Sequence, residues 1–219
     1  MPYDKKLVRR VATYVKSHLY KEHTGHDWFH ALRVLEMARR LQKEEGGDLM
    51  LIELSALVHD LGDYKKYDFS ESKGNFALTA MLDILDIERS IQEKIMKVVI
   101  QSQYKGRETK SPDSIEGKII QDSDWLETLG AIGIARNFAT GGHAGRVIYN
   151  PTIKPLSDLS KLDYQRKKSE STSFNYFFEK PLRLLNRFNT NTARKIATQR
   201  IKFLKLYINQ FLGEWEGKR

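Results

Sequence analysis

The amino-acid sequence predicts an all-α protein, folded as a compact bundle of many helices. Apolar residues recur every three or four positions along nearly every periodic segment, which places them on one face of a helix. No segment alternates apolar and polar residues in the way that a half-buried strand does. Capping residues and a glycine pair mark where successive helices begin and end.

Three helices are expected before Gly62. The first presents an apolar face at Leu7, Val11, Tyr14, Val15 and His18. The second opens at a sequence that resembles a capping box, Thr24 to Asp27, carries the stripe Leu32, Leu35, Ala38 and Leu41, and stops at Gly46-Gly47. The third, from about Leu49 to Leu61, is apolar on several faces, so we expect it to be deeply buried.

Further helices are expected near residues 75–87, 88–103 and 113–138. The last contains a run of small residues from Leu129 to Ala135, which would let a neighbouring helix approach closely. Residues 140–155 predict a Gly-rich loop, because glycine and proline recur there while the periodicity disappears. Two long amphipathic helices, near 158–189 and 191–213, complete the fold. No Pro- or Ser-rich linker divides the 219 residues, so a single domain over 1–219 is expected.

The composition limits what the protein can bind. The chain has no cysteine, which excludes disulfides and thiolate-bound metal centres and leaves His, Asp and Glu as candidate metal ligands. Its formal charge of +9 favours anionic partners such as phosphates, nucleotides or polynucleotides. The basic residues of the last third are spaced like the wet face of helices, which favours solvation over a dedicated nucleic-acid surface.

The amino-acid sequence also predicts a soluble, cytoplasmic protein with no membrane partner. The N-terminal sequence MPYDKKLVRR turns amphipathic at once and lacks the apolar core of a signal peptide. No stretch approaches the roughly 20 apolar residues that span a bilayer. The absence of cysteine suits a reducing cytosol.

His59 and Asp60 stand at the end of the apolar third helix. Their side chains are about 100° apart on a helix, so both can lean toward one point beyond the helix end. The dipeptide alone is weak evidence, because His26-Asp27 repeats it at a polar helix start. A carboxylate at the end of a buried helix is costly without a cation, and the negative potential of the helix C-terminus adds to that cost. A divalent metal ion would resolve both problems.

Two further side chains complete a candidate ligand set. His30 lies on the inward stripe of the second helix, although a lone histidine there is more often an ordinary core residue. Asp124, near apolar residues, is expected to face inward; Asp122 competes with it, and one of these two carboxylates could instead cap a neighbouring helix. Two imidazoles and two carboxylates suit one divalent ion of Mn, Fe, Co, Ni or Zn, with Mg as a further candidate.

These residues resemble the signature of the HD-domain superfamily of metal-dependent phosphohydrolases: a His, then His-Asp, then a distant Asp on an all-helical fold. The similarity extends over most of the chain, through HDWFHALRV, LVHDLGDYK, QDSDWLETLGAIGIARNFATGG, FFEK and NTNTARKIATQRIKFL, which look like a bacterial-type subfamily. The resemblance implies metal ligands at His30, His59, Asp60 and Asp124. It also implies a metal-binding core at about 20–138 and a C-terminal helical part at about 156–213.

The chain departs from that subfamily at several positions. Trp125 stands where the resemblance leads us to expect Arg, and Tyr176 where it leads us to expect His. A histidine that would support a second metal is missing near Ser102 to Tyr104, so one metal ion is expected. The Gly-Asp of HDLGD replaces a lysine of cyclic-dinucleotide members, which argues against those substrates.

Four residues are candidates for chemistry around the ion, which would activate a water molecule to attack phosphorus. Asp63 is the candidate general acid/base, with a helix-end hydrogen bond as the alternative. His26, which also matches the subfamily, could contact substrate, protonate a leaving oxygen or orient a ligand. Lys65 and Arg146 are the candidate substrate-binding cations, although plain solvation and a flexible loop compete with these roles.

The sequence therefore predicts a phosphohydrolase acting on a small phosphorylated compound, above all a nucleotide or another phosphomonoester. An iron-dependent oxidation enzyme is disfavoured by the lack of extra histidines. The main alternative is a non-catalytic or regulatory module that binds nucleotides or nucleic acid. Nucleic acid is the less favoured partner, because no aromatic-plus-basic RNA motif or recognition helix is evident. A helical scaffold with incidental His and Asp residues is the third alternative.

Overall fold

The computed structural model describes residues 3–157, 160–162 and 170–219. Every regular element within these residues is a helix, so the all-α prediction is confirmed. The α-helices are α1 (Lys5–Leu19), α2 (Trp28–Glu45), α3 (Leu49–Val58), α4 (Glu71–Ile84), α5 (Arg89–Ser102), α6 (Ile115–Leu126), α7 (Gly130–His143), α9 (Tyr176–Glu179) and α10 (Asn191–Trp215). Short 3-10 helices lie at η1 (Tyr64–Lys66), η2 (Gly106–Glu108), η4 (Pro181–Arg183) and η5 (Leu185–Arg187).

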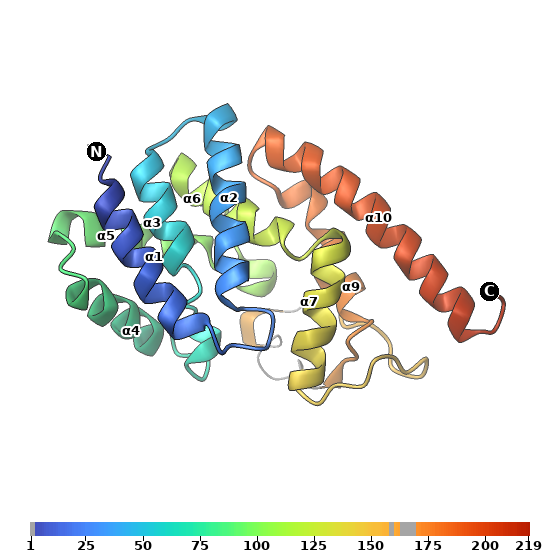
Figure 1. Cartoon of the computed structure of the whole chain (residues 1–219). Helices are drawn as coiled ribbons and strands as arrows, with labels where there is room; N and C mark the ends of the chain where they lie inside the picture. Colours follow the sequence, from blue (N-terminus) through green and yellow to red (C-terminus); the bar gives the residue numbers. More distant parts are fainter. Residues whose placement is uncertain (1–2, 158–159, 163–169) are drawn as a thin grey trace.

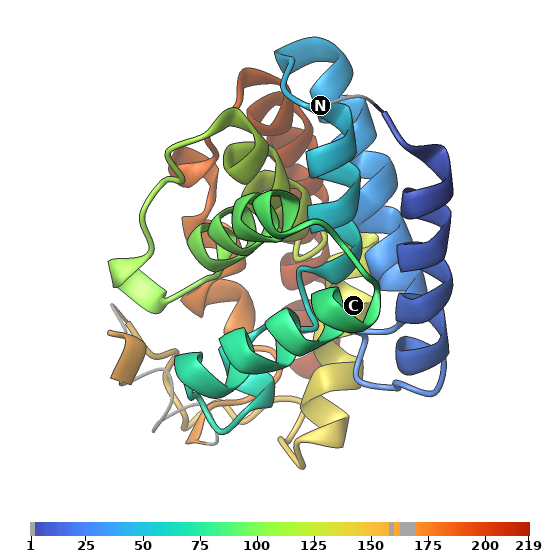
Figure 2. The ribbon, with the colours of Figure 1, turned by 90° about the vertical axis from the view of Figure 1, so that its left-hand side faces the viewer.

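Helix α3 lies at the centre of the bundle. It packs against α1, α2, α5 and α6. It lies side by side with α2 in Figure 1 and beside α5 in Figure 2. All its residues from Met50 to Val58 are buried, as its apolar residues on several faces predict. This burial includes Glu53, whose carboxylate accepts hydrogen bonds from Tyr3 and Arg39. The helix therefore carries its C-terminal residues into the interior of the protein.

The helix predicted over residues 113–138 is two helices, so that prediction is wrong in extent. Helix α6 ends at Leu126, and α7 begins at Gly130 after an extended residue, Leu129. Gly130 has a φ of +68°, which a residue with a side chain rarely adopts. A Cβ on Gly133 would lie 2.2 Å from the carbonyl carbon of Thr128, so this glycine permits the tight connection itself. The run of small residues thus serves the turn between two helices as well as helix packing.

The expected loop over residues 140–155 begins later than predicted, because α7 continues to His143. Its end is a Schellman motif: Arg146 N–H donates to Gly141 O and Gly145 N–H donates to Gly142 O. Gly145 has a φ of +67°, as the motif requires. The Gly-rich segment is therefore mainly a helix end with defined geometry, and the remaining loop runs from residue 147 onward.

A long helix near 158–189 is not found in its described residues. Residues 158–159 and 163–169 lie outside the described part of the chain, and 170–189 form α9, η4 and η5 instead. Pro181 disfavours helical geometry at the residue before it, and Lys180 has φ −130° and ψ −67°. The last predicted helix is confirmed as α10, with Thr190 as its N-cap. Helix α4 starts at Glu71, earlier than the predicted 75, because Ser70 caps it.

Candidate metal centre

Three helix ends converge to bring the predicted ligands together. Asp27 caps α2 by accepting from the backbone N–H of His30 at 2.7 Å, which fixes the first turn that carries this histidine. His59 and Asp60 directly follow the last residue of α3. Asp124 lies in the last turn of α6. The ligand set thus depends on packing between α2, α3 and α6, which contact one another in pairs.

The four candidate ligands offer atoms at the spacing that a metal ion requires. His30 Nε2 lies 3.3 Å from His59 Nε2, 3.5 Å from Asp60 Oδ2 and 3.6 Å from Asp124 Oδ1. His59 Nε2 lies 3.5 Å from Asp60 Oδ1 and 3.9 Å from Asp124 Oδ1. Ligand atoms bound about 2.1 Å from one ion are roughly 3 to 4 Å apart, so these residues fit a single divalent ion.

The hydrogen bonds of the two imidazoles give independent support for a cation. His59 Nδ1 lies 2.8 Å from the carbonyl oxygen of Ala56, which can only accept, so this nitrogen carries the proton. His30 Nδ1 faces the carboxylate of Glu127 at 3.4 Å, and Arg33 holds that carboxylate at 2.7 Å. In the neutral rings both Nε2 atoms therefore present lone pairs to each other, and a cation between them satisfies both.

Asp122 and Asp124, which competed for the ligand position, have separate roles. The Asp122 carboxylate accepts from the backbone N–H groups of Asn189 and Thr190, at 2.9 and 2.8 Å, and so holds the start of α10. Asp124 turns toward His30 and His59. The alternative that one of the pair caps a neighbouring helix thus applies to Asp122.

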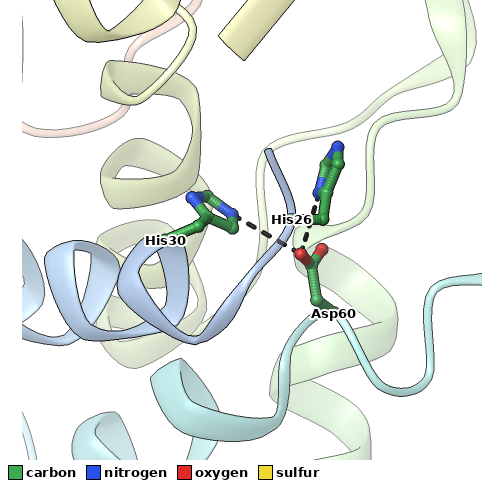
Figure 3. Close-up of side chains that lie close together, drawn as sticks. All are labelled: His26, His30 and Asp60. Carbon is green, nitrogen blue, oxygen red and sulfur yellow. Dashed lines mark hydrogen bonds and ion pairs between the residues drawn. The ribbon is translucent and has the colours of Figure 1, made fainter. Parts of the chain in front are cut away.

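His26 lies beside the four ligands rather than among them. Its Nδ1 is 2.8 Å from Asp60 Oδ2, and Figure 3 shows its second ring nitrogen turned away from that carboxylate. Arg136 reaches the same region, with its Nη2 3.4 Å from His26 Nδ1. His26, His30 and Asp60 also form a group close enough to hold an ion. The contact with Asp60 suits an orienting role for His26, and its exposed face leaves it able to meet a substrate.

The protonation states favour metal binding. Burial raises the pKa of Asp60, but the charges of His26 and Lys66 outweigh that effect and hold the pKa well below its usual range. Burial lowers the pKa of His30 well below its usual value, and the positive charge of Arg136 lowers it further. At neutral pH the aspartate is therefore an anion and the imidazole is neutral, which are the forms that bind metals.

A neutral, buried His30 makes the stability of the metal-free protein depend on pH. Its pKa is lower in the folded than in the unfolded protein, so the unfolded chain binds the extra proton as pH falls below about 6.5. Stability is thus full above that pH and decreases on acidification, by up to about 1.4 kcal/mol per pH unit for this one group. Urea unfolding in EDTA between about pH 7.5 and about pH 5 measures the slope. A His30→Gln protein should show a flatter profile, and equal slopes in both proteins would contradict this assignment.

A cavity of about 590 Å³ opens beside the ligands. Its lining includes Asp60 and Asp124 together with the predicted site residues His26, Asp63, Lys65 and Arg146. The structure therefore places all the sequence-predicted site residues in or around one pocket. A volume of this size is typical of pockets for small-molecule ligands.

Asp63 makes the helix-end hydrogen bond that was its alternative, and it also lines the cavity. Its carboxylate accepts from the backbone N–H of Lys65 at 3.0 Å and from Lys65 Nζ at 2.9 Å. Burial raises its pKa, but the Lys65 ammonium outweighs burial and the pKa lies below its ordinary value. Asp63 is therefore ionised at neutral pH, and of the two predicted roles only that of a base is open to it there.

Sequence reasoning missed several cavity residues, among them Tyr176, Arg136 and Lys180. Burial raises the pKa of Tyr176 to about 12, so its hydroxyl stays protonated and can donate a hydrogen bond into the pocket. Arg136 donates to the carbonyl oxygens of Gly25 and Glu127, at 2.6 and 3.1 Å. Arg136 and Lys180 lie within two of the motifs that carry the family resemblance, and Tyr176 stands where the chain departs from that subfamily. These signals did not show that the side chains line one cavity, because that depends on how separate segments pack.

Comparison with known proteins agrees with this geometry. The family model for the HD domain matches residues 28–129, the segment that carries all four candidate ligands. The uncharacterised protein YpgQ of Bacillus subtilis is 31% identical over 214 residues, which cover 97% of this chain and 95% of YpgQ. The chain belongs to the HD-domain superfamily. The resemblance inferred from the motifs is thereby confirmed.

Solved HD-domain structures share the whole fold. A Lactobacillus plantarum protein is 30% identical with a TM-score of 0.85, and the match covers 98% of this chain and 99% of that one. An HD-superfamily hydrolase from Bacillus thuringiensis is 36% identical with a TM-score of 0.70, over 97% and 98% of the two chains. YpgQ in complex with ADP is 29% identical with a TM-score of 0.72, over 97% of this chain and 100% of YpgQ.

No described helix of the present HD-domain protein is both long and apolar enough to cross a membrane.

Proposed function

We propose that the protein is a metal-dependent phosphohydrolase that cleaves a phosphate ester of a small molecule, with a nucleotide as its substrate. The observation that carries the proposal is the pair of opposed Nε2 atoms of His30 and His59, 3.3 Å apart, flanked by the carboxylates of Asp60 and Asp124 beside a cavity. One divalent ion held by these four residues would supply an activated water molecule and polarise a phosphoryl oxygen.

The side chains around this centre have complementary roles. Glu127 and the Ala56 carbonyl orient the two imidazoles, and His26 orients Asp60. Asp63, held ionised by Lys65, would accept a proton from the attacking water. Lys65 and Arg146 supply positive charge on the cavity wall, where phosphate oxygens would gather negative charge during the reaction. The neutral Tyr176 hydroxyl adds a hydrogen-bond donor.

Two facts support the proposed substrate class: the positive charge of the protein and the ligand found in the crystal structure of a related protein. The chain carries a formal charge of +9, and the cavity beside the ligands contains several lysines and arginines. YpgQ, which shares the fold over the whole chain, has been crystallised with ADP. Both facts support a nucleotide in the pocket of this protein, and a cavity of about 590 Å³ is large enough for one.

Phosphate release tests the proposal directly. The purified protein, stripped with EDTA, is reloaded separately with Mn, Co, Ni, Zn, Fe or Mg and offered ADP, AMP and p-nitrophenyl phosphate. We expect turnover with at least one transition metal and none in EDTA, because no other group in the cavity activates water as strongly. Binding of ADP without phosphate release under every metal would contradict the enzymatic role and favour a nucleotide-binding module.

A further inference from the structure

The cavity is electrically unbalanced once a metal ion is bound. Among the described residues, its lining includes five carboxylates, Glu22, Asp60, Asp63, Asp124 and Glu127, and five basic side chains, Lys65, Lys66, Arg136, Arg146 and Lys180. The negative charges of these carboxylates equal the positive charges of the lysines and arginines. A bound divalent cation therefore gives these groups a net charge of about +2. A bound ligand with more than one negative charge would neutralise that surplus.

Three of the basic side chains already have oxygen partners. Lys65 pairs with Asp63 at 2.9 Å, and Lys66 Nζ lies 3.9 Å from Asp60 Oδ2. Arg136 donates to two backbone carbonyl oxygens. These cations contribute to the positive potential of the cavity but are partly committed to the protein itself.

Lys180 has no such partner in the described part of the chain. Its residue is 7% exposed, and the ammonium lies 4.3 Å from the centre of the Tyr104 ring. Within the described part of the chain, no carboxylate lies within 4.0 Å of this ammonium and no acceptor oxygen receives a hydrogen bond from it. The residue is buried while lining the cavity, and the ring face replaces only part of what a carboxylate partner would contribute to a lysine charge.

Arg146 likewise has no ion-pair partner among the described residues. Its Nε is buried without a hydrogen-bond partner, and the described residues provide no ion pair for its guanidinium. The Schellman motif at the end of α7 fixes its backbone through the bond from Arg146 N–H to Gly141 O, 2.9 Å long. A Cβ on Gly141 would lie 3.6 Å from Arg146 Nη2 and 2.0 Å from Ser173 Oγ, so the glycine makes room at this corner. The backbone of Arg146 is therefore fixed at the end of α7, and its side chain lines the cavity.

We propose that Lys180 and Arg146 form an anion subsite that receives a second anionic group of the ligand, separate from the phosphate placed at the metal centre. The inference rests on the proposed function in taking that ligand to be the substrate. Both side chains line the same cavity, where they can donate charge-assisted hydrogen bonds to an anionic ligand, and bonds of this kind are the stronger class. The subsite would favour nucleoside diphosphates, or other ligands with two anionic groups, over singly phosphorylated ones.

ADP binding to the metal-free protein tests the subsite without any catalytic readout. Isothermal titration in EDTA compares the wild type with Lys180→Met and Arg146→Met. Each substitution should weaken ADP binding by about tenfold or more, because a charge-assisted hydrogen bond is lost. Lys154→Met removes an equal charge from an exposed position and should leave the affinity unchanged.

Stability separates this role from a structural one. Removing a buried, unpaired charge should leave Lys180→Met at least as stable to urea as the wild type, whereas a lysine that holds the fold together would lose stability on substitution. Lys180→Arg keeps the charge and should retain ADP binding, which covers the case in which Lys180→Met does not fold. Unchanged ADP affinity in both methionine variants, or no ADP binding by the wild type, overturns the subsite.

The outcomes also separate this inference from the proposed function. A protein that releases no phosphate with any metal, yet loses ADP affinity in both variants, has the subsite without the hydrolase activity. A protein that hydrolyses ADP, with the same affinity in both variants, has the activity without the subsite.

Discussion

Asp60→Asn should reduce both metal retention and phosphate release by roughly 10²-fold to 10³-fold or more, the largest functional effect expected for this protein. The substitution keeps the size of the side chain but removes the negative charge that His26, His30 and Lys66 surround. A neutral amide oxygen is a weaker ligand for a divalent ion, and the remaining set has only one carboxylate. The measurements are elemental analysis after dialysis and phosphate release under the preferred metal.

Asp86→Asn is the matched control. Asp86 is exposed in the turn after α4, far along the chain from the ligands, and asparagine tolerates its φ of +47° well. This control should keep its metal and its activity. An Asp60→Asn protein that retained a full equivalent of metal and normal turnover would remove the basis for the site.

Gly133→Ala should lower the free energy of unfolding by on the order of 3 kcal/mol, the largest stability effect expected. The new Cβ would lie 2.2 Å from Thr128 C and 2.3 Å from Thr128 O, both backbone atoms that cannot move aside. The connection between α6 and α7 would have to open. Because Asp124 lies in the last turn of α6 and α7 carries Arg136, metal affinity should fall as well.

Gly142→Ala provides the comparison for this prediction. Gly142 lies in the last turn of the same helix, and a Cβ there would meet no atom within 4 Å. The alanine should be neutral or stabilising by roughly 0.5 to 1 kcal/mol, because it has the higher helix propensity. Urea denaturation of the two variants measures the difference, and equal stabilities would show that the turn accommodates the added atom.

Much of the helical framework follows from local sequence. The apolar face of α1 and the apolar residues on several faces of α3 each predicted an element close to its observed bounds. Helix α10 was predicted for the same reason, since its apolar residues recur at helical spacing from Ala193 to Ile208. These elements were predictable because the signal for each lies within the helix itself. The capping box predicted at Thr24 to Asp27 is wrong in detail, because α2 starts later, with Asp27 itself as its N-cap.

Other parts of the fold did not follow from apolar periodicity. The break between α6 and α7 depends on how closely the Thr128 backbone approaches Gly133, and periodicity continues across it. The region from 170 to 189 has apolar residues, Phe174 and Phe177 among them, that are buried without forming a long helix. Buried apolar residues can have a similar spacing in a series of turns and in a helix. The spacing of apolar residues in this region therefore predicted the wrong element.

The sequence by itself determined the helical class, the superfamily and the four residues proposed as ligands, because His30, His59-Asp60 and Asp124 follow a recognisable order along the chain. Only the tertiary structure decided which groups surround them. It assigned Asp122 to the start of α10 and Asp124 to the centre, and it fixed the proton on His59 through the Ala56 carbonyl. It also buried Lys180 without a carboxylate partner among the described residues. Protonation, pairing and charge balance depend on distances in space, and those distances are set by how α2, α3, α6 and α7 pack.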